Sequence, residues 1–165
     1  AVTLKEEIDY VRSYIELQML RYDHAFDVTI NLERAILRLG VLKLTLQPIV
    51  ENAIQHGLGE MQAGGHIVIE GSIQQDKLVL RVSDNGRGMD AVKVAQVNAA
   101  LTKTYVAGET GSIGLGNVHQ RNVILFGEGY GIRLSSTVGV GTTVELLQPI
   151  MSKEEMERYV QGVHR

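Results

Sequence analysis

A twelve-residue stretch sets an acid, an amide and an imidazole on one side of a predicted helix. It reads Leu-Gln-Pro-Ile-Val-Glu-Asn-Ala-Ile-Gln-His-Gly, from Leu46 to Gly57. Apolar residues recur in it at spacings of three and four, which predicts one apolar helical face, with Glu51, Asn52 and His56 between the apolar positions. A solvated face would more often carry Lys and Glu. A carboxylate can act as a general base, and an amide oxygen can bind a hard cation, so this polar stripe could do chemistry.

Three other stretches carry an acid or closely spaced glycines. Asp84 begins Asp-Asn-Gly-Arg-Gly after a strand-like segment, and a carboxylate buried there would need hydrogen-bond donors. An Asx turn is the alternative, and Gly86 and Gly88 allow either a tight turn or close approach of a ligand. Gly-Leu-Gly-Asn, from Gly114, is expected just before a helix, where backbone N–H groups attract phosphate. The last stretch is Gly-Val-Gly-Thr-Thr, from Gly139.

In this order, the four stretches resemble the ATP-binding domain of sensor histidine kinases, and the wording of the first is closest to the LytS-like group of bacterial two-component sensors. The resemblance covers nearly the whole chain. It implies the Bergerat fold, shared with gyrase-type topoisomerases, mismatch-repair ATPases of the MutL kind and a cytosolic chaperone. We therefore expect an α/β fold: a two-layer sandwich of one mixed sheet with helices on one face. The implied reaction transfers the ATP γ-phosphoryl group to a histidine, with magnesium.

The resemblance implies a role for each stretch. Asp84 would accept a hydrogen bond from the adenine amino group, with Thr142 beside it. Asn52 would be the magnesium ligand, and Glu51 a general base or a group that positions water. His56 could contact a phosphate, although capping a helix end is the commoner role of such a histidine. The other expected ATP-binding residues are Asn85, Gly86, Gly88, Met89, Gly114, Leu115, Gly116 and Asn117.

The third stretch departs from the family pattern at two positions. Ser112 stands where the family has its first glycine, and Gly116 stands where this group often has arginine. The stretch is not a Walker A loop, because no Gly-Lys-Ser or Gly-Lys-Thr follows, and no strand leads directly into it as in a dinucleotide-binding fold. These departures concern the phosphate contacts and leave the family resemblance intact.

Hydrophobic periodicity predicts the elements that must position these stretches. A capping box at Thr3 opens an amphipathic helix to about Tyr22. The resemblance implies that this helix is the end of a dimerisation hairpin, and the alternative is a simple docking helix. Further helices are expected at 91–101, 117–126 and 151–163. Alternation predicts strands at 26–32, 66–74, 77–83, 131–136 and 142–147, with a hairpin at Gln75-Asp76. Residues 102–112 lack apolar periodicity and are expected to form a mobile lid over the nucleotide.

Composition limits the remaining possibilities. The chain has 165 residues, 44% of them hydrophobic, which is enough for one domain with a real core. A net charge of −3 implies no broad basic surface for nucleic acid. Cysteine is absent and the histidines lack metal-type spacing, so we expect neither disulfides nor a thiolate metal site. No signal peptide or membrane-spanning run is visible, and we expect a cytoplasmic domain of a protein anchored in the membrane through upstream segments.

Three regions are expected: 1–23 as the end of the dimerisation helix or a linker, 24–150 as the ATP-binding catalytic domain, and 151–165 as a C-terminal helical tail. In the resembling group the acceptor histidine lies in an upstream Asn-Pro-His-Phe-type segment, which this chain lacks. The chain should therefore bind ATP without phosphorylating itself. The expected partners are the upstream dimerisation and phospho-acceptor helix, a cognate response regulator and a second copy in the full-length protein, with no nucleic acid.

Two other functions remain open from the sequence. One is another Bergerat-fold ATPase, such as an anti-sigma serine kinase or a gyrase-like domain, but those lack the residue pattern of the Leu46 to Gly57 stretch. The other is a non-catalytic module for nucleotide sensing or dimerisation. The presence of Glu51, Asn52 and Asp84 argues against it.

Overall fold

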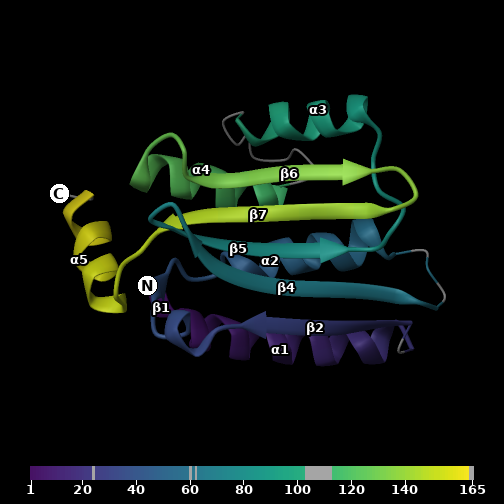
Figure 1. The fold of residues 1–165 in the computed structure, drawn as a ribbon, viewed down its shortest axis with the longest axis horizontal. Coiled ribbons are helices and arrows are strands. Elements are labelled where there is room, and N and C mark those ends of the chain that lie inside the picture. Colours follow the sequence, from purple (N-terminus) through teal and green to yellow (C-terminus); the bar gives the residue numbers. More distant parts are fainter. Residues whose placement is uncertain (24, 60, 62, 103–112, 164–165) are drawn as a thin grey trace.

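A five-stranded mixed sheet forms one layer of the molecule (Figure 1). The computed structural model describes residues 1–23, 25–59, 61, 63–102 and 113–163. The strand order is β2–β4–β5–β7–β6, in which β2 and β4 pair in parallel and the other neighbours are antiparallel. The strands are β2 (Phe26–Leu32), β4 (Gly65–Gln74), β5 (Lys77–Asp84), β6 (Gly131–Thr137) and β7 (Gly141–Pro149). All five predicted strands are therefore confirmed, and their ends agree to within two residues.

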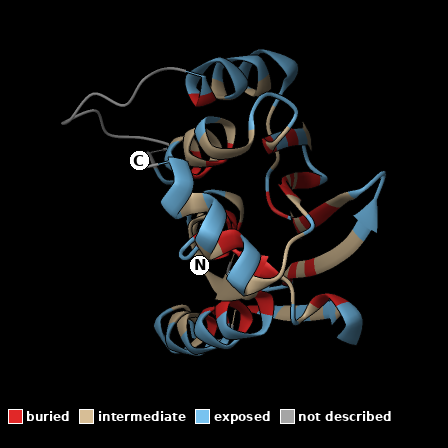
Figure 2. Ribbon diagram, turned by 90° about the vertical axis from the view of Figure 1, so that its left-hand side faces the viewer, coloured by how far each residue is buried: buried red, intermediate tan, exposed pale blue. Residues whose placement is uncertain are grey.

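Helices cover one face of the sheet. Behind it in Figure 1 lie α1 (Leu4–Arg21), α2 (Leu46–Asn52) and α4 (Ile113–Phe126), while α3 (Ala91–Leu101) runs along the β6 edge. Alternate strand residues point to this face and are buried, as the two-residue period of a strand requires; they include Ile67, Ile69, Leu80, Val82, Val144 and Leu146. In the edge view of Figure 2 the buried positions gather between the layers, which confirms the predicted two-layer α/β sandwich.

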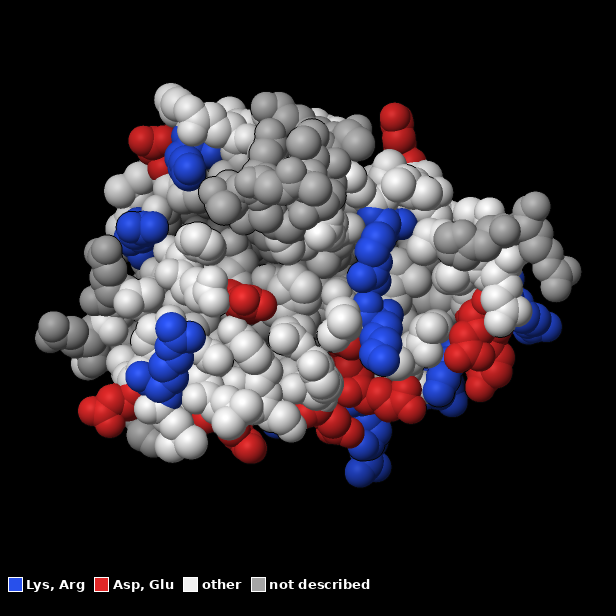
Figure 3. Space-filling view, turned by 180° about the vertical axis from the view of Figure 1, so that it is seen from behind, with Lys and Arg blue, Asp and Glu red and all other residues white. Residues whose placement is uncertain are grey.

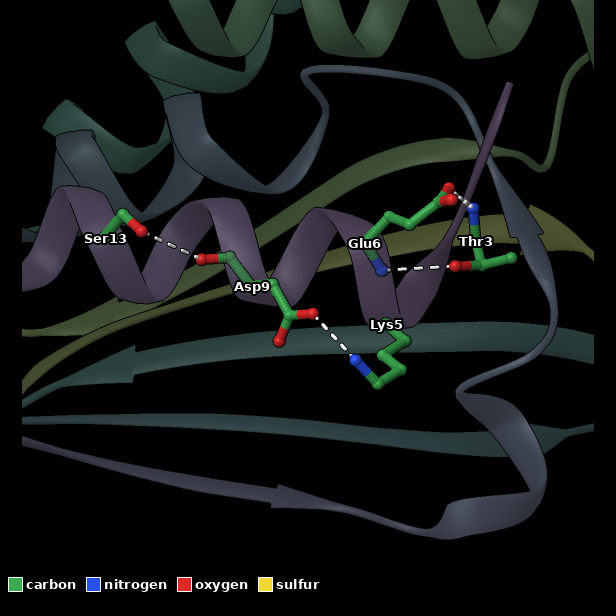
Figure 4. Close-up of polar contacts among 5 residues, drawn as sticks. All are labelled: Thr3, Lys5, Glu6, Asp9 and Ser13. Carbon is green, nitrogen blue, oxygen red and sulfur yellow. Dashed lines mark hydrogen bonds and ion pairs between the residues drawn. The ribbon is translucent and has the colours of Figure 1, made fainter.

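The first helix belongs to the same core as the sheet. Its predicted capping box is present: Thr3 N–H donates to Glu6 Oε2 at 2.8 Å, and Glu6 N–H donates to Thr3 Oγ1 at 3.1 Å (Figure 4). The inward side chains of α1 join the core, and they are Leu4, Ile8, Val11 and Ile15. Because α1 packs on α2 as part of one body, the division at residue 23 stays a prediction about the longer protein.

The helix α4 begins earlier than predicted. Its first residue is Ile113 rather than a residue near Asn117, so Gly114 and Gly116 lie in its first turn and not before it. Packing outweighs the poor helix propensity of glycine here, because Leu115 and Val118 are buried in the core. The expected lid can be compared only at Thr102, the C-cap residue that follows α3, since 103–112 lie outside the described residues.

Short elements near the N-terminus escaped prediction. Two-residue strands β1 (Val2–Thr3) and β3 (Gly40–Val41) pair antiparallel, and a 3₁₀ turn spans Arg34–Ile36. Segments this short show no periodicity. The predicted C-terminal helix is confirmed as α5 (Lys153–Val163), which packs against β3.

The surface carries charge of both signs. On the helix-covered side, Figure 3 shows Lys and Arg in separate groups beside Asp and Glu, without a continuous basic field. Across the described ranges, no helix combines the length and apolar character needed to cross a bilayer.

Candidate functional site

A cavity of about 570 Å³ gathers residues from all four stretches. The predicted residues in its walls are Asn52, His56, Asp84, Gly88, Met89, Leu115 and Thr142. A smaller hollow of about 130 Å³ adjoins it, because Asn52, His56 and Leu115 line both, and it adds Glu51 and Gly114. Stretches far apart in sequence thus form two adjacent compartments.

The helical segment that carries Asn52 changes its winding at that residue. The α-helix α2 ends at Asn52, and Ala53–Gly57 continues as a π-helical turn in which Leu58 N–H donates to the Ala53 carbonyl at 3.0 Å. Such turns inside helices are frequently found at functional sites. The Asn52 side chain has no hydrogen-bond partner within the described part of the chain. Its amide is therefore available to a ligand.

Glu51 lies on the smaller hollow only. Its Oε1 accepts a hydrogen bond from Gln55 Nε2 at 3.3 Å, and the side chain is half-buried. Asn52 lines both compartments, so the two adjacent residues serve different spaces that meet. This arrangement permits an amide and a carboxylate to act on one group held between them.

The Asp84 carboxyl sits half-buried at the end of β5. Burial raises its pKa, while hydrogen bonds from the backbone N–H groups of Gly86 and Thr142 oppose the rise. Gly86 N–H lies 2.9 Å from Oδ1. Asp84 is paired with Thr142 across β5 and β7, so these two residues are neighbours, as the resemblance implies. The carboxyl is partly dehydrated and can accept further donors from a ligand.

The hydroxyl of Thr142 belongs to a small network. Ser136 Oγ donates to the Gly141 carbonyl at 2.9 Å, and it accepts from Met89 N–H at 2.8 Å. Since Ser136 has one proton to give, the 2.8 Å contact with Thr142 Oγ1 is donated by Thr142. The Thr142 oxygen is left able to accept a hydrogen bond in the cavity.

The glycines of the site make room for protein backbone. A Cβ on Gly86 would overlap the Gly57 carbonyl, and a Cβ on Gly57 would lie 2.6 Å from the Asp84 carboxyl. Gly88 has φ +66° and lies against the Thr137 carbonyl. Gly57 ends the helical segment as expected, yet its φ is not positive, so close packing requires it rather than a left-handed cap. The ligand interpretation of Gly86 is therefore unnecessary.

Four predicted ATP-binding residues lie outside the walls of both compartments: Asn85, Gly86, Gly116 and Asn117. Asn85 instead closes the start of β4. Its Oδ1 accepts from His66 N–H at 2.7 Å, and its Nδ2 donates to the Gly64 carbonyl at 2.9 Å. It holds the Asp84 segment against the neighbouring strand.

Several wall residues were not predicted. They are Gly57, Arg87, Asp90, Lys93, Val97, Leu134 and Val138. Arg87 and Lys93 bring positive charge to the cavity, and Asp90 caps α3 by accepting from Lys93 N–H at 2.8 Å. Arg87 stood within the second stretch and could have been included. Lys93 had no sequence signal, because only the packing of α3 beside β6 brings its first turn to the cavity.

The donor set suits a cation that arrives with a ligand. No cluster of three His, Asp or Glu side chains that could hold a metal occurs among the residues that the structure describes. The smaller hollow offers the amides of Asn52 and Gln55 and the carboxylate of Glu51. Magnesium commonly binds through one or two protein groups plus phosphate oxygens and water, so these residues fit it.

Sequence comparison finds a family match over the site. The sequence model of the "Histidine kinase-, DNA gyrase B-, and HSP90-like ATPase" family matches residues 40–151. The chain is 34% identical over 148 residues to the sensor histidine kinase YesM of Bacillus subtilis, covering 90% of this chain and 24% of that protein. It is 30% identical over 165 residues to the sensor protein LytS of Staphylococcus epidermidis, covering 99% and 27%. The chain thus spans about a quarter of the length of these relatives.

Structural comparison finds the same fold in solved proteins. The catalytic domain of histidine kinase ThkA matches with a TM-score of 0.65 at 18% identity, covering 90% of this chain and 95% of that one. The histidine kinase domain of a blue-light activated kinase from Erythrobacter litoralis matches with a TM-score of 0.58 at 18% identity, covering 97% and 65%. At these identities the likeness concerns the fold.

Proposed function

The chain belongs to the family of histidine kinase-, DNA gyrase B- and HSP90-like ATPases, and from this premise we propose that it is the ATP-binding catalytic domain of a sensor histidine kinase. The proposed reaction transfers the γ-phosphoryl group of ATP to a histidine on a separate upstream segment. The observation that carries the proposal is the single cavity in which Asn52, Asp84 and Thr142 meet. The relatives YesM and LytS are named a sensor histidine kinase and a sensor protein, which supports the same conclusion.

Asp84 and Thr142 form the proposed adenine subsite. The Asp84 carboxylate would accept a hydrogen bond from the exocyclic amine of adenine, whereas guanine presents a carbonyl at the equivalent position. A dehydrated acceptor is costly until a donor reaches it, so the subsite favours a ligand with an N–H at this point. The free acceptor capacity of Thr142 suits a second hydrogen bond, either direct or through water.

Asn52, Glu51 and the start of α4 form the proposed phosphate side. Asn52 would hold magnesium through its amide oxygen, with the phosphates between it and Gly114. Magnesium, when bound, would neutralise charge that develops on the phosphate oxygens. Glu51 would accept the proton from, or orient, the imidazole nitrogen of the acceptor histidine. His56 lines both compartments and could contact a phosphate.

The longer protein would supply the other parts needed for phosphotransfer and signalling. Because relatives are sensors about four times as long as this chain, we expect a longer protein that supplies a phospho-acceptor helix, forms a homodimer and phosphorylates a response regulator. We also expect this domain to be cytoplasmic and the longer protein to be anchored in the membrane.

Calorimetry on the chain tests the nucleotide assignment. ATP and ADP should bind more tightly than GTP, with magnesium strengthening the binding of ATP. Equal affinity for GTP would contradict the adenine subsite. Phosphotransfer to a supplied acceptor helix from the longer protein separates the alternatives. Binding without transfer would indicate a non-catalytic module, and transfer to serine would indicate a kinase of the anti-sigma type.

A further inference from the structure

A buried carboxylate outside the cavity joins α1 to the helix that carries Asn52. The Glu7 side chain of α1 is nearly inaccessible, with 3% of the residue surface exposed. It accepts three backbone hydrogen bonds from successive N–H groups at the start of α2: Leu44 at 3.3 Å, Thr45 at 3.0 Å and Leu46 at 3.1 Å. A buried charge with three donors is well compensated.

Glu7 takes the place of a local helix cap. Thr45 occupies the N-cap position of α2, but its hydroxyl donates to the Leu42 carbonyl at 2.9 Å instead of accepting from the helix. The first N–H groups of a helix lack partners within it, and negative charge is favourable at this end. Glu7 supplies both the acceptor and the charge from a different element.

A third helix holds the same loop. Arg121 of α4 donates from Nη2 to the Lys43 carbonyl at 2.7 Å. Burial lowers the pKa of Arg121 and the Glu7 carboxylate opposes this, so the two charges are close enough to interact. Leu44 between these anchors has φ +58°, a strained conformation for a bulky residue, which persists only where the surroundings enforce it.

The middle of α1 also lies near the C-terminal end of α2. Burial, together with the Glu51 carboxylate, raises the pKa of Tyr14 to about 12. Glu7 contacts the start of α2 and Tyr14 lies near Glu51 toward its end, so the two helices run side by side in the same direction.

We propose that Glu7 is a positioning residue, which sets the location of α2 and thereby places Asn52 and Glu51 at the phosphate side of the site. The inference rests on the proposed function. A short helix moves as a unit, so a shift at its first residues displaces Asn52 as well. Asp84 and Thr142 lie on the sheet and are not held by Glu7. Loss of the Glu7 contact should therefore affect the phosphate side and spare the adenine side.

The test compares Glu7→Gln with Asp9→Asn by calorimetry on the 165-residue chain. Asp9→Asn is a matched control, because it removes one negative charge from the same helix at a solvent-exposed pair with Lys5 (Figure 4). Each variant is titrated with adenosine and with ATP plus magnesium, at a temperature where it is folded. Glu7→Gln should weaken ATP–magnesium binding by roughly tenfold or more, since a charge-assisted acceptor is lost, and leave adenosine affinity unchanged. Asp9→Asn should change neither.

The inference would be overturned if the binding of adenosine and of ATP–magnesium weakened equally, or if ATP–magnesium binding did not change. Glu7 would then be a stabilising residue only. Glu7→Asp provides a second variant if the glutamine form does not fold. It keeps the charge but is one methylene shorter, so it should show the same selective loss to a smaller degree. Failure of the unmodified chain to bind ATP would instead overturn the proposed function.

Discussion

At the residue scale, the Asp84 carboxylate contributes little to the stability of the ligand-free protein. Its pKa is raised mainly by burial, so it favours folding below its ordinary value of 3.8, and that contribution is lost as pH rises through the higher folded value. Near pH 7 the ionised Asp84 carboxylate therefore lowers the free energy of unfolding, and a ligand that binds it can offset this loss.

Replacing this carboxylate should separate stability from binding. We expect Asp84→Asn to raise the melting temperature at pH 7, because the amide is neutral and its oxygen can still accept from Gly86 N–H. The same change should weaken ATP binding by about 1–3 kcal/mol, the cost of losing a hydrogen bond to a charged group. Thermal melts and calorimetry measure the two effects. A variant that is less stable and binds ATP normally would show that Asp84 serves the turn alone.

Glu51 and Asn52 should differ in what they contribute. Asn52→Ala is expected to weaken magnesium-dependent nucleotide binding and to abolish the proposed phosphotransfer in the longer protein. Glu51→Ala should leave binding largely intact and slow transfer by roughly 10²–10⁴, as for loss of a general base. Binding, melting temperature and transfer rate are measured on both variants. If Glu51→Ala lowered stability and affinity together, with no selective loss of rate, Glu51 would be a structural anchor.

His119 gives the fold a pH-dependent contact. Its Nδ1 accepts from Ile132 N–H at 2.9 Å, which requires the neutral ring, and burial lowers its pKa below 6.5. The stabilising contribution is complete above about 6.5 and is lost as pH falls toward the lowered value, since the unfolded chain takes up the proton first. His119→Gln, which cannot titrate, should reduce the fall in melting temperature between pH 7.5 and 5.5. An unchanged pH dependence would argue against the contact.

At the element scale, the site depends on segments packed at backbone distance. The Asp84–Gly88 segment lies against the π-helical turn, with Arg87 N–H donating to the Gly57 carbonyl at 3.3 Å. It also lies against the β6–β7 turn, where Gly139 N–H donates to the Arg87 carbonyl at 2.8 Å. Backbone hydrogen bonds thereby join the segments that carry the proposed adenine and phosphate sides.

A pair of glycine substitutions tests this packing. Gly86→Ala should destabilise the fold by about 1–3 kcal/mol, as overpacking does, because its Cβ would overlap Gly57 backbone. Gly116→Ala meets nothing within 4 Å in the first turn of α4 and should be neutral or stabilising by up to about 1 kcal/mol. Urea unfolding compares them. Equal stability of the two variants would contradict the close approach.

At the scale of the whole molecule, the first and last helices, α1 and α5, contact each other and pack on the fold. Met156 of α5 is fully buried, and the Tyr159 ring lies 5.6 Å from that of Phe126 between centroids. Lys153 pairs with Glu6 of α1 at 3.6 Å. The C-terminal helix is thus part of the fold, and none of its residues is among those that line the cavity.

Shortening the buried methionine should therefore affect stability alone. Met156→Ala is expected to cost about 2–5 kcal/mol, as for other buried methionines, with nucleotide affinity unchanged. Val163→Ala, at an exposed position of the same helix, should cost less than about 0.5 kcal/mol. Chemical unfolding and calorimetry provide the comparison. A loss of affinity in folded Met156→Ala would show that the tail influences the site.

The strands, most helices and the four stretches could be predicted because their signals are local. Alternation marked β5 and β7, helical spacing marked α2, and the acid Asp84 at the end of β5 marked the second stretch. Local signals failed where packing overrode them. Burial of Leu115 and Val118 favours an earlier start of α4, which then includes two glycines. The two-residue strands β1 and β3 exist only because each pairs with the other.

The roles of other residues depended on contacts between distant segments. Glu7 is one acid among several on an amphipathic helix until α1 lies along α2, and its three hydrogen bonds reach residues 37 to 39 positions away. Gly86 reads as a turn residue until the Gly57 carbonyl occupies the space of its side chain. Periodicity indicates which face of an element is apolar. Which groups hydrogen-bond to a buried charge, and which atoms occupy the space beside a glycine, is determined only when the faces pack.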